Sequence, residues 1–391
     1  MRPKKALIAG AGIAGLAAGI ALRKAGLEVE LFERTDDLCE IGAGLSIWPN
    51  GTEALRNLGV EVRALPVRRL AVRSWRGKHR TEVPVDALPA RYGSEMLLVH
   101  RADLQAGLSA AFGDGGIRFR SEVAGFTAEG DGVRLTLRSG ESALGDLVLG
   151  ADGLRSAVRD QLLDDGPPVY LGSTIWRGIA PPDGINLEPG QGLNWVGRGG
   201  EFLAFHLAGD RIYWAGVARA TEGGRPGLEG HKPGLLERFR DWDDLVPALI
   251  GATDEKDILR NDMYDRPPAH RWAVGRVALI GDAAHPMTPN AGQGACQALV
   301  DAVVLGDCLA SVPDVVAAMR AYQERRLARA NSVVRISRQA TRASQLENPL
   351  LCSLRDISGA LLPRALMLRL LGSTMAPSPT EREGWLKHEG V

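Results

Sequence analysis

The chain of 391 residues has little of what marks several classes of protein. It has only 4 cysteines and no Cys-x-x-Cys pair, which argues against a disulfide framework or a zinc ribbon. Its 47 basic and 47 acidic residues cancel, so no strong field favours nucleic acid or an anionic membrane. No uncharged apolar run is long enough to span a bilayer, and no signal peptide precedes the first motif. We therefore expect a cytoplasmic monomer or homodimer that acts on small molecules and has no metal site.

A glycine-rich motif follows the first apolar run, Lys5 to Ala9. Gly10 permits a tight turn, Gly12 lets the backbone approach a pyrophosphate, and Gly15 lets the following helix pack closely. The second apolar run ends in Glu33, whose carboxylate can accept hydrogen bonds from an adenosine ribose. The pattern predicts an anionic nucleotide at the start of a helix, and the alternative is an ordinary turn.

A second glycine-bearing site lies near residue 282. Val277 to Ile280 is an apolar strand, and Asp282 stands just beyond its carboxyl end, where α/β sheets bind ligands. Ala291 to Leu299 is expected to be a helix whose first N–H groups are free. Asp282 can bind ligand hydroxyls, or it can simply cap the next helix. A chain with both sites is suited to one long dinucleotide, with adenylate at one end and flavin at the other.

Three motifs together resemble those of the class A flavoprotein aromatic hydroxylases, the group that includes urate and salicylate hydroxylases and zeaxanthin epoxidase. They are the Gly10 motif, the Asp-Gly motif Gly150-Ala-Asp152-Gly153, and the Gly-Asp motif Gly281-Asp282. The resemblance extends to about residue 375. It implies an α/β fold with a Rossmann-like, glutathione-reductase-type FAD-binding domain, an inserted antiparallel-sheet substrate domain and a C-terminal helical segment. The expected boundaries are 1–67, 101–169 and 270–310 for the first, 68–100 and 170–269 for the second, and 311–391 for the third.

The same resemblance implies an FAD-dependent monooxygenase. It would use NADH or NADPH, bound transiently, and O2 to hydroxylate an aromatic or other electron-rich molecule through a flavin C4a-hydroperoxide. Epoxidation of an alkene and a non-hydroxylating flavoprotein oxidoreductase are the alternatives. A halogenase is disfavoured because no Trp-x-Trp-x-Ile-Pro motif is present, and a plain NAD-dependent dehydrogenase would leave Asp282 without a role. A non-catalytic protein of the same fold would purify without colour.

The resemblance also assigns the cofactor-binding residues one by one. Asp152 can serve FAD and NAD(P)H or cap the following helix, and Val123 can be an ordinary strand residue. The expected FAD-binding residues are Gly10, Gly12, Ala14, Gly15, Glu33, Arg34, Gly44, Arg101, Gln105, Val123, Asp152, Asp282, Pro289, Ala291, Gly292 and Gly294.

Substrate and catalytic residues are expected on the second sheet and around the oxygen pocket. Pro289, Tyr213 and His206 are the catalytic candidates, although His206 can be a base only if it faces the cavity. Ile47, Trp48, Trp195, Phe205 and Tyr213 are the expected substrate-binding residues.

Some charged residues are harder to assign. Glu201 stands where urate hydroxylases have a catalytic arginine, which argues against urate as the substrate. Arg155, Arg159 and Arg177 can meet nucleotide phosphates or be solvated. The arginine-rich helix that includes Arg326 is expected to be a solvated face or a subunit contact. The stretch from Leu350 to Met375 is expected to pack on the body, with a peripheral membrane contact as the alternative.

Overall fold

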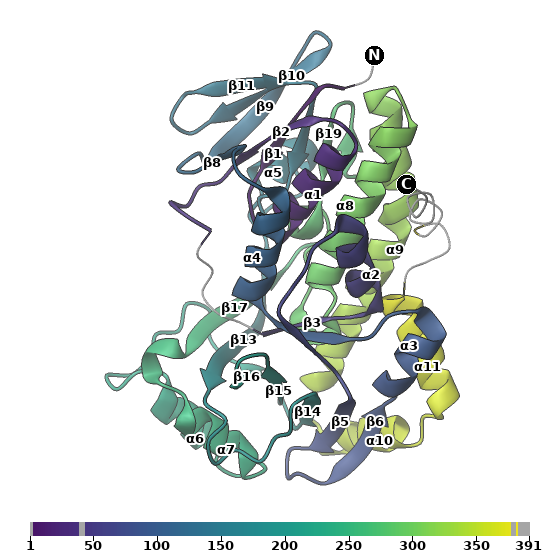
Figure 1. Ribbon diagram of the computed structural model, residues 1–391. Coiled ribbons are helices and arrows are strands. Elements are labelled where there is room, and N and C mark those ends of the chain that lie inside the picture. The colour runs from purple at the N-terminus through teal and green to yellow at the C-terminus, as the bar shows by residue number, and fades with distance from the viewer. Residues whose placement is uncertain (1–2, 39–43, 377–380, 382–391) are drawn as a thin grey trace.

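The computed structural model describes residues 3–38, 44–376 and 381. Two bodies are stacked along the molecule, and each is built on a β-sheet (Figure 1). The upper body contains a six-stranded sheet, and the lower body contains a seven-stranded sheet. The fold is therefore mixed α/β.

The six-stranded sheet is parallel except at one edge. Its central strands β1, β12 and β19 are nearly continuous apolar runs because helices or a second sheet cover both faces. In spatial order they are β18 (Ala273–Val274), β19 (Val277–Leu279), β12 (Leu147–Gly150), β1 (Lys5–Ala9), β2 (Glu28–Phe32) and β8 (Ile117–Arg118), and only β18 is antiparallel to its neighbour. The carboxyl ends of β1, β12 and β19 thus lie side by side at one edge.

Helices cover one face of this sheet, and a small sheet covers the other. The helical face carries α1 (Ile13–Lys24), α4 (Arg101–Phe112) and α8 (Gly294–Ser311), which share one apolar core. The opposite face carries α5 (Ala157–Leu163) and the three-stranded sheet of β11 (Ser142–Gly145), β10 (Gly132–Leu137) and β9 (Val123–Glu129). Among the described strands β10 pairs with β9 and β11 alone, so this small sheet is separate from the six-stranded one.

The seven-stranded sheet is mostly antiparallel. Its order is β17 (Leu259–Asp265), β13 (Val169–Ala180), β16 (Arg211–Arg219), β15 (Gly200–Leu207), β14 (Gln191–Val196), β5 (Arg69–Ser74) and β6 (His79–Val83). Helices α6 (Lys232–Phe239) and α7 (Leu245–Ala252) pack on its outer face and enclose a second core. Its inner face contributes to the main core with residues of the upper body.

Short elements connect the two bodies. A three-stranded sheet contains β3 (Gly44–Ile47), β7 (Leu97–His100) and β4 (Ala64–Pro66), next to α2 (Pro49–Leu58) and α3 (Leu88–Tyr92). Single turns of 3-10 helix are η1 (Val85–Ala87), η2 (Glu255–Asp257), η3 (Gly281–Ala283) and η4 (Pro289–Ala291).

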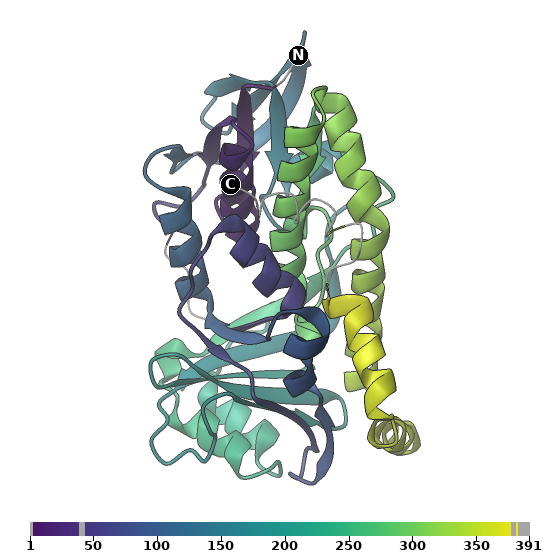
Figure 2. The ribbon, with the colours of Figure 1, turned by 45° about the vertical axis from the view of Figure 1, so that its right-hand side comes forward.

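Three helices close the chain. The 30-residue helix α9 (Val315–Ser344) runs beside α8 and reaches the lower body, where α10 (Pro349–Ala360) and α11 (Arg364–Met375) follow (Figure 2). Among the described residues, α8 alone is long and apolar enough to cross a membrane, but 72% of it is buried inside the molecule. It is therefore the central core helix, enclosed by α1, α2 and α9.

Candidate active site

The first glycine motif lies at the carboxyl end of β1 and begins α1. Gly10 has φ +95°, and a Cβ on it would come within 2.5 Å of the Ala151 carbonyl oxygen. A Cβ on Gly15 would lie 2.0 Å from the carbonyl oxygen of Gly10, so helix and loop touch through backbone. Gly12 differs, because no atom of the described residues lies within 4 Å of its Cβ position. It is the N-cap of α1 and makes no side-chain cap, so the helix N-terminus borders open space suited to a pyrophosphate.

Glu33 lies beside this loop at the end of β2. Its carboxylate accepts a hydrogen bond from the Ala11 N–H at 2.9 Å and another from the Thr35 N–H at 3.0 Å. Half-buried, it remains accessible to a ligand next to Gly12. Its position agrees with the expected contact to a ribose, while its backbone bonds also fix the loop.

The two glycine-bearing sites meet in space. A Cβ on Gly281 would lie 2.7 Å from the Ala14 Cβ, and one on Gly294 would lie 3.9 Å from Asp282 Oδ1. Although part of Asp282 is exposed, desolvation by the surrounding protein raises the pKa of its carboxyl against the opposing charges of His285 and Arg101. Residues about 270 positions apart in sequence thus form one continuous site.

Asp152 and Gln105 add buried acceptor atoms. Asp152 Oδ2 accepts from the Ala157 N–H at 2.8 Å, so Asp152 binds the first turn of α5, whose N-cap is Ser156. Asp152 Oδ1 is buried and has no partner among the described residues, and the same holds for Oε1 of Gln105. Burial raises the pKa of Asp152 although hydrogen bonds from Ser156 and from backbone amides oppose it. Buried acceptors of this kind need an explanation, and a ligand rich in hydroxyl groups provides one.

The loop before α8 approaches β3. Gly292 has φ +60°, and a Cβ on it would lie 2.6 Å from Ser46 Oγ and 3.0 Å from Trp48 Nε1. That indole N–H is itself buried without a partner. The sequence placed the start of this helix at Ala291, but α8 begins at Gly294, because η4 and the left-handed Gly292 come first. Pro289 is exposed at the start of η4.

Strands β15 and β16 bring an aromatic pair under β3. The rings of Phe205 and Tyr213 lie 5.0 Å apart, and a Cβ on Gly44 would come within 2.4 Å of the Tyr213 ring. Ile47 is fully buried in the same core. Burial raises the pKa of Tyr213 to about 12, against the effect of Arg177. The phenol is therefore neutral at physiological pH and can donate a hydrogen bond.

Known proteins share both this fold and its motifs. Residues 4–165 and 255–337 match the FAD binding domain family. The chain is 40% identical over 355 residues to the aurachin C monooxygenase/isomerase of Stigmatella aurantiaca, which covers 90% of this chain and 92% of that protein. It is 35% identical over 337 residues to the FAD-dependent urate hydroxylase of Klebsiella pneumoniae, covering 84% and 88%. The structure of Klebsiella pneumoniae HpxO complexed with FAD and uric acid superposes with a TM-score of 0.90 at 31% identity, covering 95% and 96%.

The chain belongs to the class A flavoprotein hydroxylases. The expected family and FAD-dependent monooxygenase class are thereby confirmed.

Two site expectations for this monooxygenase are wrong because the side chains lie on the other face of the sheet. Trp195 packs edge-on against Phe202 in the core under α6 and α7. His206 is paired with Ile212 of that same core, whereas its neighbour Phe205 belongs to the main core. Successive side chains of a strand alternate between faces, so neither residue can line a site beside Tyr213.

Two arginines expected at the surface are structural in the flavoprotein. Arg159 is fully buried and donates to the carbonyl oxygens of Ala283 and Ala284 at 2.9 Å, so it is unavailable to nucleotide phosphates. Arg326 on α9 is also fully buried, where it donates to Asp301 at 2.7 Å and pairs with Glu381. Both side chains therefore stabilise, from the interior of the protein, the loops that carry the motifs.

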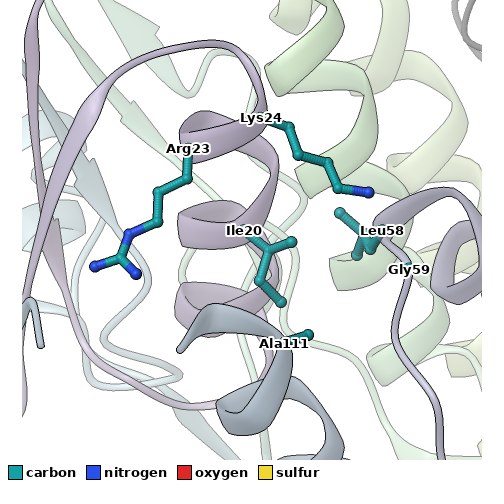
Figure 3. A pocket seen from close by; sticks show the side chains of 6 residues that line it. All are labelled: Ile20, Arg23, Lys24, Leu58, Gly59 and Ala111. Atoms are coloured by element: carbon teal, nitrogen blue, oxygen red, sulfur yellow. The ribbon is translucent and has the colours of Figure 1, made fainter. Parts of the chain in front are cut away.

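A shallow surface depression between α1, α2 and α4 is not the active site (Figure 3). Arg23 and Lys24 border it, and both side chains already bind backbone carbonyl groups of neighbouring segments. Arg23 donates to the Gly115 carbonyl oxygen at 2.9 Å, and Lys24 donates to that of Asn57 at 2.9 Å. The depression lies at the end of α1 opposite Gly12.

From the sequence, Glu201 serves only as an argument against urate, and neither its burial nor its partner is apparent. It is only 8% exposed on β15 and accepts a hydrogen bond from Asn290 Nδ2, in the loop between Pro289 and Ala291. Burial raises the pKa of Glu201 to about 7, although Arg355 and a hydrogen bond from Ser344 lower it. The pairing depends on Asn290, 89 positions away in the chain, and no local pattern specifies it.

Replacing Glu201 with glutamine should stabilise the protein at alkaline pH. The folded protein holds the Glu201 proton more tightly than the unfolded chain, so stability falls as pH rises from the ordinary value of 4.5 through about 7. Above that range the loss amounts to about 3 kcal/mol. Urea unfolding at pH 5 and pH 8 measures it. Glu201→Gln should be close to the wild type in stability at pH 5 and more stable than the wild type at pH 8. An equal difference in stability at pH 5 and at pH 8 would contradict the assignment.

Proposed function

We propose that this monooxygenase uses NADH or NADPH and O2 to hydroxylate a small aromatic or similarly electron-rich molecule. The reaction would take place beside β3, where Phe205 and Tyr213 meet the loop that starts at Pro289. The observation that carries the proposal is the contact between Gly281 and Ala14, which joins a nucleotide-binding motif to a site next to these aromatic rings.

The described residues fit FAD. Open space at Gly12 suits the pyrophosphate, and the buried acceptors of Asp152 and Gln105 suit hydroxyl groups. When bound, FAD supplies the redox and oxygen-transfer chemistry, which lies outside the repertoire of side chains. The residues proposed to hold it are Gly10, Gly12, Ala14, Gly15, Glu33, Arg34, Gly44, Arg101, Gln105, Val123, Asp152, Asp282, Pro289, Ala291, Gly292 and Gly294.

The protein's own part is orientation and exclusion of water. Phe205 and Ile47 present apolar surface, and the neutral Tyr213 phenol can orient an oxygen or nitrogen of the substrate. Trp48 offers an indole N–H that no protein group uses. Pro289 has no N–H, so the loop at this point offers a substrate only its ring and carbonyl oxygen. Apolar surface of this kind helps to keep water away from reactive intermediates.

The two bodies divide the work in this proposal. Residues 1–67, 101–169 and 270–310 bind FAD, residues 68–100 and 170–269 select the substrate, and residues 311–391 support both. No second Gly-x-Gly-x-x-Gly sequence is present, so NAD(P)H is expected to visit the flavin site briefly. The cytoplasm is the expected location.

The substrate class follows from the site and from relatives. Relatives of this chain carry names that refer to urate and to aurachin C. In this chain, aromatic rings and single hydrogen-bond donors face the site, which suits a planar ring. Urate itself is disfavoured because a carboxylate, Glu201, stands where urate hydroxylases have an arginine.

Purification and a coupled assay test the function. The protein should be yellow, with the absorbance of bound FAD, and should consume NADH or NADPH faster when phenols, heteroaromatics, quinolones or polyenes are added. Mass spectrometry of the products should show the addition of one oxygen atom, and the product structure separates ring hydroxylation from epoxidation. Failure to retain FAD after reconstitution would contradict the flavoprotein. Peroxide as the sole product across the panel would contradict only the hydroxylase.

A further inference from the structure

Glu201 lies on the face of the lower sheet that looks toward the proposed substrate. Residues 201, 203 and 205 of β15 share one face, because side chains of a strand alternate. Phe205 of this face belongs to the main core together with Tyr213, and so does Val217, which is paired with Glu201. Glu201 is therefore a carboxylate within an otherwise apolar surface.

Its hydrogen-bond partners fix Glu201 at the loop that precedes α8. Asn290 Nδ2 donates to Glu201 Oε1, while Asn290 Oδ1 accepts from Thr341 Oγ1 at 2.6 Å. Asn290 is thus held by α9 and cannot easily turn away. Because Pro289 and Ala291 flank it, the carboxylate is placed next to the loop proposed to line the oxygen-transfer site.

The protein leaves the charge of Glu201 without a direct counterion. Within the described part of the chain, its hydrogen-bond donors are the neutral Asn290 and Ser344, and no cation forms an ion pair with it. Arg355 on α10 acts on it only through space, since its guanidinium binds Asp356 and the carbonyl oxygens of Gly197 and Ala343. A buried carboxylate is costly, and a hydrophobic residue of the same size would be cheaper for stability alone. The carboxylate can still accept further hydrogen bonds.

A second acceptor lies on the same face. Asn194 of β14 is paired with Leu203, so it is a diagonal neighbour of Glu201 at about 7–8 Å. Its amide oxygen is buried and has no partner in the part of the chain that the structure describes. Two hydrogen-bond acceptors that lack enough protein donors therefore lie on one surface. They indicate a ligand that brings its own N–H or O–H groups.

We propose that Glu201 accepts a hydrogen bond, and then the proton, from a ring hydroxyl or ring N–H of the substrate, and so selects neutral hydroxy- or N–H-bearing aromatics over aromatic carboxylates. This inference rests on the proposed hydroxylase function. In the transfer the O–H or N–H bond breaks, the proton bonds to a Glu201 oxygen, and the electron pair stays on the ring heteroatom. That pair raises the electron density of the ring carbons that are to be oxygenated.

The acid strength of Glu201 suits this task. Burial raises its pKa to about 7, so both protonation states are populated near neutrality. A general base is most effective when its pKa lies near the working pH. The groups that act on it are Asn290 from η4, Ser344 from α9 and the charge of Arg355 from α10, while Thr341 of α9 holds Asn290 in place.

The test compares matched ligands on the FAD-loaded enzyme. Phenol, 2-naphthol and 4-hydroxyquinoline are each titrated beside the corresponding methyl ether and carboxylate, and Kd is read from the change in flavin absorbance between pH 6 and pH 8. In the wild type, the hydroxyl compounds should bind at least about tenfold more tightly than their ethers and carboxylates, and more tightly as the pH rises. In Glu201→Gln, the preference should fall to within about threefold and lose its pH dependence between these values.

Glu347→Gln is the matched control, because Glu347 is an exposed carboxylate that lies against Gly199, just before β15. It should behave as the wild type does. The proposal is overturned if Glu201→Gln keeps the preference, or if the wild type binds carboxylates or ethers as well as it binds the hydroxyl compounds. Bound FAD and substrate-stimulated NAD(P)H oxidation are measured on the same samples. A wild type that hydroxylates but shows no such preference refutes the role of Glu201 and leaves the proposed function intact.

Discussion

Gly12→Val should yield a folded protein that no longer holds FAD. The backbone of Gly12 has φ −71° and ψ −170°, an extended conformation that valine adopts without strain, and no protein atom lies within 4 Å of its Cβ position. The added side chain would instead occupy the space at the N-terminus of α1 where the pyrophosphate is expected. Blocking several charge-assisted hydrogen bonds should weaken FAD binding by more than about a hundredfold. Flavin content after purification and fluorescence titration of the apoprotein measure the loss.

Two other glycines give this experiment its controls. Gly251 in α7 also has nothing within 4 Å of its Cβ position, so Gly251→Val should retain both fold and FAD. Gly15→Ala should fail differently, because its Cβ would lie 2.0 Å from the Gly10 carbonyl oxygen and would disrupt the fold itself. Circular dichroism and thermal unfolding separate the two kinds of failure. Normal FAD affinity in a folded Gly12→Val protein would show that the pyrophosphate lies elsewhere.

Local patterns predicted the elements around the motifs well. The run from Lys5 to Ala9 became β1 with the same bounds, and the glycines after it lead into α1, because strand, turn and helix are each specified by neighbouring residues. The apolar run at Val277 likewise became β19, with Asp282 just beyond it. The start of α8 was misplaced by three residues, since the left-handed turn at Gly292 depends on contacts with β3.

The faces of the lower sheet could not be read from the sequence. Period-two alternation identifies a face only when one side is polar, and here both sides are covered. Trp195 and Tyr213 are both buried aromatics, but one packs under α6 and α7 and the other under β3. The parallel pairing of β14 with β5 joins residues more than a hundred positions apart, and no local pattern specifies it.

The burial of charged residues could likewise not be predicted from the sequence. The spacing of arginines along α9 resembles a solvated helix face, and only the fold shows that Arg326 meets Asp301 of α8. Asp301 also accepts a hydrogen bond from the Gly281 N–H at 3.1 Å, and its carboxylate is hydrogen-bonded to His285 Nε2 at 2.5 Å. One carboxylate therefore links the core helices to the loop that carries Asp282.

Because of this linkage, Asp301→Asn should destabilise the protein strongly and also weaken FAD binding. All three partners are buried, so the variant leaves the charge of Arg326 with less compensation, a situation that costs about 3–5 kcal/mol. Burial alone would raise the pKa of Asp301, but His285 and Arg326 outweigh it and hold the pKa below the usual range. The stabilisation is therefore fully present above the ordinary value of 3.8 and is lost as the pH falls below it.

Asp307→Asn is the control for this variant, because Asp307 on the same helix pairs with Arg325 near the surface. It should cost no more than about 1 kcal/mol. Urea unfolding of both variants, with flavin content measured beside it, tests the comparison. Loss of stability with normal FAD affinity in Asp301→Asn would show that the Gly281 loop keeps its shape without the carboxylate. Equal losses of stability in the two variants would show that the buried ion pair of Asp301 contributes no more to stability than the pair of Asp307. The linkage predicts instead that stability and FAD affinity fall together at Asp301 and not at Asp307, because only Asp301 touches the backbone of the Gly-Asp motif.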